Sequence, residues 1–335
     1  MDVISGSSIS SKKWNALINV SVFSTPFQTP EYFNFFNSVS GLSAEVFAIE
    51  EESKLLALCV VTFQKEKGIK SFFSKRAIIY GGPLIAEDER GDYALGLLLS
   101  HMNKELKHKV IYAETRNFND YSLYKGCFLK NDWNYTPYLN FQILLHGKTL
   151  DDIIAAMKYN RRREIQLSLK SGAYIKEAEN IEDVKNLYVI LSDLYANRVK
   201  LPLPNLEFFI SLYNSCIGKI FIVKHNEKII GGSFCIYYQG NSIYTLYYCS
   251  LRNYHQKIFS THLAILETIK FGIKNNLMKV DLMGAGKPDE KYGVRKYKSE
   301  FGGNMVEYGR FIKIYNTTLF NLGNIGLKII KKIKR

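Results

Sequence analysis

The chain has 335 residues, 47% hydrophobic and 23% charged, which argues against a disordered protein and leaves room for two domains. Five widely spaced cysteines without a C-x-x-C pair argue against a disulfide framework or a zinc site. The net charge of +14 favours an anionic partner such as nucleic acid, a diphosphate or an anionic lipid surface, unless it only reflects a basic surface.

The first residues lack the basic start and apolar run of a signal peptide, and no later apolar segment is long enough to cross a bilayer. His255 and His262 have no partner side chains at a metal-binding spacing. We therefore expect a cytoplasmic protein with no bound metal and no bound redox cofactor.

The first half of the chain predicts a mixture of helices and strands. In chain order we expect helices over 14–18 and 31–39, a hairpin of strands over 44–50 and 55–64, strands over 77–83 and 110–114 around a helix over 93–106, and a closing strand over 139–145. Prolines at 26 and 30 predict a turn between the first two helices, because proline blocks helix continuation.

The second half predicts a similar order of elements. Thr149 is the expected N-cap of a helix that reaches about residue 171, with acidic residues in its first turn. After it we expect helices over 181–199 and 206–215, strands over 220–224, 228–238 and 242–250, a helix over 260–275, a strand over 279–283 and a final strand near 304–315.

This order is the one expected of a Gcn5-related N-acyltransferase (GNAT) domain. We therefore predict an α/β fold of two tandem GNAT-like domains, each with a mixed sheet flanked by helices. The expected bounds are 1–147 and 148–316, followed by a basic amphipathic tail over 317–335. That tail, with lysines at 328, 331, 332 and 334, could sit on an anionic membrane or be a frayed terminus.

The window over 281–310 combines glycines, cations and aromatic residues. Five glycines before Asn304 would weaken a helix or a strand, and charges interrupt any apolar stripe. We interpret the window as a loop that closes over an anionic or carbonyl-bearing ligand.

Several motifs resemble the Fem family of peptidoglycan aminoacyltransferases and its relatives with a BioF2-like domain. They are the helix over 161–165 ending in Lys170-Ser171-Gly172, Tyr195-x-x-Arg198-x-Lys200-Leu201-Pro202, Gly231-Gly232, and Tyr292-Gly293-Val294-Arg295-x-Tyr297-Lys298-x-x-Phe301-Gly302-Gly303. Residues 26–30 and 80–83 resemble the family more weakly. The resemblance implies two GNAT-type domains and transfer of amino acids from aminoacyl-tRNA to a lysine-type amine of a cell-wall precursor.

Amide formation needs a positive group where the oxyanion develops. Lys298 matches the family position implicated in that role, with Tyr297 packed beneath it; the alternative is a surface lysine on a strand edge. Arg295 could fork onto a phosphate or carboxylate, or pair with Glu300 or Asp289.

The resemblance also implies substrate contacts by Arg198, at a position that contacts a diphosphate, and by Tyr248. Arg198 could instead be a cation at a helix C-terminus, and Tyr248 a core residue. Tyr80 is a weaker substrate-binding candidate. Arg161, Arg162 and Arg163 could hold tRNA phosphates or form a solvated helix face.

The donor is expected to be aminoacyl-tRNA or acyl-CoA. Ordinary GNAT enzymes cradle the pyrophosphate on a glycine-rich turn before their long helix, but residues 251–259 contain no glycine. We therefore expect a Fem-like transferase acting on a nucleotide- or lipid-linked cell-envelope precursor. The alternatives are an acyl-CoA-dependent N-acyltransferase of polysaccharide synthesis and a non-catalytic basic binding protein.

Overall fold

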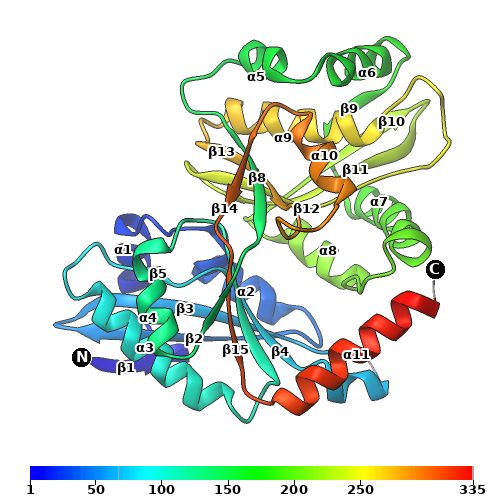
Figure 1. The fold of residues 1–335 in the computed structure, drawn as a ribbon. Coiled ribbons are helices and arrows are strands. Elements are labelled where there is room, and N and C mark those ends of the chain that lie inside the picture. Colours follow the sequence, from blue (N-terminus) through cyan, green and yellow to red (C-terminus); the bar gives the residue numbers. More distant parts are fainter. Residues whose placement is uncertain (67, 334–335) are drawn as a thin grey trace. The chain divides into compact units, whose positions relative to one another are not determined.

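The computed structural model describes residues 1–66 and 68–333, and the chain divides into two compact units (Figure 1). Unit 1 contains Met1–Pro137 together with the residues from Tyr308 onward, and unit 2 contains Tyr138–Glu307. Lys334 and Arg335, the last two cations of the expected tail, lie outside the described residues.

Unit 1 is a mixed sheet with helices, and its strands follow the order β1-β2-β3-β4-β6-β15-β7, with β5 paired to β3. The strands are β1 (Asp2–Ser5), β2 (Ser43–Glu51), β3 (Lys54–Gln64), β4 (Arg76–Gly81), β5 (Leu84–Ile85), β6 (Tyr112–Asn117), β7 (Asn134–Thr136) and β15 (Arg310–Ile314). The helices are η1 (Gly6–Ser8), α1 (Ser11–Val20), η2 (Pro26–Gln28), α2 (Pro30–Ser38), η3 (Gly68–Phe73), α3 (Gly91–Leu106), η4 (Ser122–Tyr124), α4 (Lys125–Lys130) and α11 (Thr317–Ile333).

Unit 2 is also a mixed sheet with helices, in the strand order β9-β10-β11-β12-β13-β8-β14. The strands are β8 (Leu139–Leu144), β9 (Tyr174–Glu177), β10 (Gly218–His225), β11 (Lys228–Tyr238), β12 (Ser242–Ser250), β13 (Lys279–Gly284) and β14 (Asn304–Glu307). The helices are α5 (Leu150–Ala156), α6 (Tyr159–Lys170), α7 (Ile181–Leu194), the π-helix η5 (Tyr195–Val199), α8 (Leu206–Asn214), α9 (Ser260–Lys274) and α10 (Gly293–Ser299).

The two units exchange one strand each. β8 follows β7 in the chain but pairs with β13 and β14 in unit 2, and β15 follows β14 but pairs with β6 and β7 in unit 1. Phe311 of β15 stacks on Phe128 of α4 in the core of unit 1, with ring centroids 3.9 Å apart. The compact units therefore have different bounds from the expected domains 1–147 and 148–316, because each sheet takes an inner strand from the other half of the chain.

Many of the predicted elements are confirmed. The hairpin β2–β3 forms as expected. The strands predicted over 220–224 and 228–238 form as β10 and β11, which pair through a turn with Asn226 and Glu227 at positive φ. The predicted long helix is α9. Thr149 caps α5 as expected: its hydroxyl accepts from Asp152 N at 3.2 Å, and the Asp152 carboxylate accepts from Thr149 N.

Three sequence predictions need correction. The helix expected over 149–171 is two helices, α5 and α6, which are separated at Met157 and Lys158. The final strand expected over 304–315 is β14 followed by β15, in different sheets. The window expected as a loop contains the helix α10, which is possible because its glycines lie at or beyond the helix ends and leave 294–299 free of them.

The core of unit 2 lies between the sheet and α9. Leu263, Ile265 and Ile269 of α9 are fully buried with Val280 and Leu282 of β13. This packing fixes the position of β13, whose end carries the candidate site. No helix in the described part of the chain is long and apolar enough to cross a membrane.

Candidate functional site

The sheet of unit 2 forks between β12 and β13. Their parallel ladder pairs Ser242 with Lys279, Ile243 with Val280 and Tyr244 with Asp281, and extends no further in the described chain. Beyond it, 245–250 of β12 continues along β11 through a register shift that follows Thr245, while Gly284 of β13 pairs with β8. We call the two segments that no longer pair with each other, 245–250 and 282–284, the strand fork. Register shifts of this kind are frequent next to active sites.

Lys298 of α10 reaches the β13 side of the strand fork. The residue is only 4% exposed, which rules out the alternative of a surface lysine on a strand edge. Its ammonium donates to the carbonyl oxygens of Leu282, Met283 at 3.3 Å and Gly284 at 2.7 Å. An ammonium has three donors, so these carbonyls engage all of them.

Asp281 completes this end of β13, and the sequence prediction missed its role. The residue is fully buried, and its carboxylate accepts from Gln142 Nε2 at 2.9 Å and from Met283 N at 2.6 Å. Met283 has φ of 63°, a left-handed conformation that costs a non-glycine residue of order 1–3 kcal/mol. Such strain occurs mainly where the surroundings enforce it. The sequence signal was a charged residue inside the apolar run Val280-Asp281-Leu282.

Burial shifts the titration of both charged groups. It lowers the pKa of Lys298 to about 8, although the Asp281 carboxylate opposes this. Burial likewise raises the pKa of Asp281, against the opposing effect of Lys279 and the hydrogen bond from Gln142. Lys298 can therefore change its charge within a pH range in which enzymes work.

Tyrosines gather on α10, β12 and the nearby helix end. The rings of Tyr248 and Tyr297 lie 6.0 Å apart, and burial raises the pKa of Tyr248, with Tyr292 and Tyr195 as further causes. The neighbouring Tyr247 instead packs on Phe209, 5.4 Å away. The Tyr297 hydroxyl is buried without a hydrogen-bond partner in the described chain. An orphaned buried hydroxyl needs a special explanation, and a bound ligand is one.

Arg161 of α6 supports α10. Its guanidinium pairs with Glu164 and Glu300, each at 2.7 Å, contacts His262, and lies 5.3 Å from the Tyr297 ring. Burial, followed by the Arg161 charge, lowers the pKa of His262 to about 3. Because Arg161 is bound in this cluster, it is not a free phosphate ligand, contrary to one sequence-based alternative.

The other two arginines of that run lie differently. Arg162 donates to the carbonyls of Ala155 and Met157, and Arg163 is exposed on α6. These contacts favour the solvated helix face for Arg163 and a structural role for Arg162.

Arg295 holds the loop that follows β13. It donates to the carbonyl oxygens of Ala285 at 3.0 Å, Pro288 at 3.1 Å and Lys287. The ion pair with Glu300 or Asp289, which was the alternative to a ligand contact, does not occur in the described chain. Arg295 and Lys298 lie three residues apart on α10, so one short helix fixes 282–288 through two cations.

Arg198 lies in the π-helix η5 and is exposed, with no polar partner in the described part of the chain. Single π-helical turns occur frequently at functional sites. The helix ends at Lys200, whose φ of 54° is left-handed. Arg198 is therefore available to an anionic ligand.

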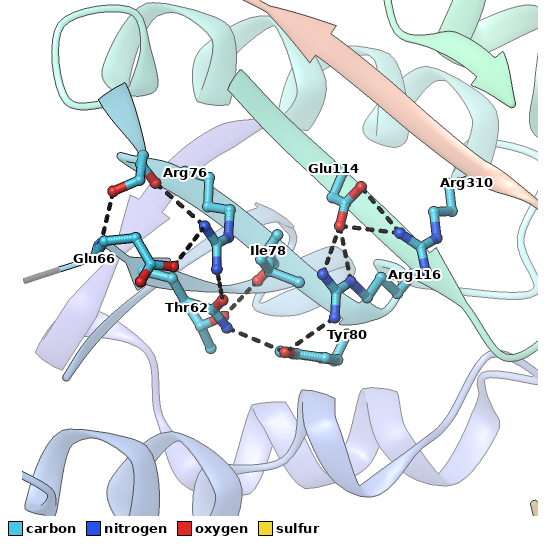
Figure 2. A network of polar contacts seen from close by, with 10 residues as sticks. Thr62, Glu66, Arg76, Ile78, Tyr80, Glu114, Arg116 and Arg310 are labelled. Atoms are coloured by element: carbon cyan, nitrogen blue, oxygen red, sulfur yellow. Dashed lines mark hydrogen bonds and ion pairs between the residues drawn. The ribbon is translucent and has the colours of Figure 1, made fainter. Parts of the chain in front are cut away.

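Tyr80 belongs to unit 1, whereas the other five predicted site residues belong to unit 2. Its hydroxyl accepts from Gln64 Nε2 at 3.1 Å and Arg116 Nη1 at 3.4 Å (Figure 2). Arg116 and Arg310 both pair with the buried Glu114 (Figure 2). Tyr80 thus lies in an internal polar network on the sheet of unit 1.

The two segments that resemble the family more weakly meet in unit 1. The Gln28 side chain donates to Tyr80 O at 2.8 Å and Val60 O, and accepts from Val60 N at 2.7 Å. It thereby bridges β3 and β4 where their own ladder has ended. Residues 26–30 and 80–83 therefore form a structural bridge.

The sequence matches no protein-family model and no curated protein. The fold is similar to that of several solved structures. FemX shares 12% identity, with a TM-score of 0.71, over 96% of this chain and 99% of that one. The C-terminal domain of a putative lysylphosphatidylglycerol synthetase from Agrobacterium fabrum shares 9%, with a TM-score of 0.59, over 96% and 95%.

A tandem GNAT protein from the clavulanic acid biosynthesis pathway shares 8% identity, with a TM-score of 0.59, over 94% of this chain and 99% of that one. At such identities the similarity establishes the fold alone. The chain has the tandem GNAT-like fold that its element order predicted.

Proposed function

We propose that the protein is a Fem-like acyl- or aminoacyltransferase that forms an amide on an amine of a cell-envelope precursor, with its chemistry at the strand fork of unit 2. The observation that carries the proposal is the buried Lys298 at the strained end of β13, together with the buried Tyr297 hydroxyl of the same helix, which has no hydrogen-bond partner in the described chain. Buried charge, backbone strain and a shifted pKa coincide there, and such coincidence is typical of functional sites.

Lys298 is suited to stabilise the oxyanion of the tetrahedral intermediate. Its contact with Met283 O is the longest of the three, so it is the one that a donor carbonyl would replace. The contacts with Leu282 and Gly284 would hold the ammonium in place meanwhile. A fixed donor at the developing charge contributes more than a mobile one, because it needs no reorganisation during the reaction.

The remaining predicted residues would position the substrates. Tyr248 and Tyr297 would offer aromatic surface and hydroxyl groups at the fork, and Arg198 would bind an anionic part of the precursor. Arg295 would act indirectly, since it holds the loop over 285–288.

The surroundings of α9 favour aminoacyl-tRNA over acyl-CoA as the donor. Phe259 N, at the start of this helix, donates to Ser168 Oγ of α6 at 2.9 Å. The Phe259 ring stacks on His262 with centroids 5.2 Å apart. A pyrophosphate cradle needs free backbone N–H groups at this helix start, and here one is already engaged.

The names of two structural neighbours agree with this proposal. The name FemX refers to the Fem family, which the sequence motifs of this chain resemble. The name lysylphosphatidylglycerol denotes a lipid that carries an amino acid. Both suggest an aminoacyl donor and an acceptor from the cell envelope for this chain.

A mass-spectrometric transfer assay tests the proposal. The protein would be incubated with either charged tRNA or acetyl-CoA, together with nucleotide- and lipid-linked envelope precursors. We expect an amide product with charged tRNA, and at least about a hundredfold lower turnover in Lys298→Met. Lys296→Met, an exposed lysine of the same helix, is the matched control.

Unchanged thermal melting of Lys298→Met would separate a catalytic effect from unfolding. If a product forms with acetyl-CoA but not with charged tRNA, the protein is an acyl-CoA-dependent N-acyltransferase instead. If neither donor gives a product and the protein only binds polyanions in a salt-sensitive way, the protein is a non-catalytic basic binder.

A further inference from the structure

Unit 1 exposes an apolar patch on two adjoining elements. Phe72 and Phe73 of η3 are 60% and 42% exposed, and Leu322 and Ile325 of α11 are 49% and 54% exposed. We call these four residues the apolar patch. Most of the other phenylalanines of the chain are buried, so an exposed pair on a single helical turn needs an explanation.

The two elements are packed directly against each other. A side chain added at Gly323 would have its Cβ 3.1 Å from Phe73 O, so the backbones of α11 and η3 approach closely at this glycine. On a different side, Phe320 packs edge-on against Tyr112 of β6, with ring centroids 5.2 Å apart. The patch is therefore held on the folded unit, where α11 lies along its margin (Figure 1).

Cations flank the patch in the sequence. η3 contains Lys70 and is followed by Lys75, and no aspartate or glutamate occurs from residue 67 to 86. The last turns of α11 contain Lys328, Lys331 and Lys332, and no acidic residue follows Glu307. At a rise of about 1.5 Å per residue, the backbone positions of these lysines lie within about 15 Å of that of Leu322 along the helix.

We infer that the apolar patch and its flanking cations bind the surface of an anionic lipid bilayer. Exposed aromatic and aliphatic side chains partition into the boundary between headgroups and acyl chains, while nearby lysines attract anionic headgroups. Nucleic acid would use the cations but would leave the four apolar side chains in water. The inference is independent of the proposed chemistry, which lies in unit 2.

Vesicle sedimentation of the full-length protein tests this inference. We expect binding to mixed phosphatidylglycerol and phosphatidylcholine vesicles, weakened by salt, and little binding to phosphatidylcholine alone. The double variant Phe72→Ser, Phe73→Ser should lower the partition coefficient at least about tenfold, because two partly exposed aromatic rings no longer insert.

Leu123→Ser is the matched control, since Leu123 is 91% exposed in unit 1 but lies outside the patch. It should bind vesicles as the wild type does. Circular dichroism melting would show that each variant is folded. Wild-type binding by the double variant would overturn the inference, because the basic tail alone would then suffice. The inference would also be overturned if the wild-type protein bound tRNA but did not bind anionic vesicles.

Discussion

The two units share one strand order but differ at their parallel strand pair. In unit 1, β4 and β6 pair over six positions, from Arg76 with Tyr112 to Gly81 with Asn117. In unit 2, β12 and β13 pair over only three. The parallel strands therefore stay paired along β4 and β6 in unit 1, whereas β12 and β13 separate after three pairs in unit 2.

Charge follows the same division. Burial alone would raise the pKa of Glu114 in β6, but Arg116 and Arg310 together hold it below its ordinary value. In β13 the pKa of the buried Asp281 is raised instead, and that of Lys298 is lowered. In unit 1 the two arginines stabilise the buried Glu114 charge. In unit 2 the partners of Asp281 and Lys298 do not offset the cost of burying their charges, and the backbone at Met283 is strained. We regard this difference as the physical basis for placing the chemistry in unit 2.

The largest expected effect concerns the exchanged strands. A chain of residues 1–147 lacks β15, so β6 keeps only its pairing with β4, β7 loses its pairing with β15, and Phe128 loses the Phe311 ring. We expect no cooperative unfolding transition in circular dichroism. Thr136 pairs with Arg310, so joining 1–137 to 309–335 through Asn-Gly should restore a folded unit 1. A cooperative transition for 1–147 alone would contradict the exchange.

The next largest effect is expected when the buried carboxylate of each unit is replaced, because the two substitutions should lower the unfolding free energy by different amounts. Glu114→Gln leaves Arg116 and Arg310 without their shared charge and should cost about 3 kcal/mol of unfolding free energy, at the lower end for a broken buried pair because both arginines are partly exposed. Asp281→Asn should cost only about 1 kcal/mol, because the native state already disfavours the Asp281 charge. Urea denaturation measures both, and equal losses would remove the contrast.

The smallest effect on stability is expected at Arg198. Because its side chain is exposed and lacks a polar partner in the described chain, Arg198→Ala should change the unfolding free energy by less than about 0.5 kcal/mol. It should nevertheless raise KM for an anionic precursor about tenfold, through loss of a charge-assisted contact. Lys185→Ala, an exposed cation on α7, is the control. Equal KM values for the two variants would remove Arg198 from the site.

The sequence predicted the fold class well because local patterns define it. Alternating apolar residues and the N-cap at Thr149 act within a few residues of each other. The strand exchange could not be predicted, since the alternation over 139–145 suits an inner strand of either sheet. The α10 helix was missed because its stabilising contacts, from Arg295 and Lys298 to carbonyls, are tertiary.

The site was predicted only in part for the same reason. Lys298 was predicted because it matches a position of the Fem family motif, where it follows an aromatic residue and precedes a Gly-Gly pair. The roles of Arg161 and Asp281 depend on partners far away in the sequence: Glu300 and Gln142 each lie 139 positions distant. No local pattern reports such pairs.

The pH dependence of transfer tests the central claim most directly. If protonated Lys298 stabilises the oxyanion, kcat should fall as pH rises through about 8, where burial places its pKa, while Lys298→Met should be at least about a hundredfold slower and lack this limb. Lys298→Met with wild-type turnover, or with the same alkaline limb, would contradict the account.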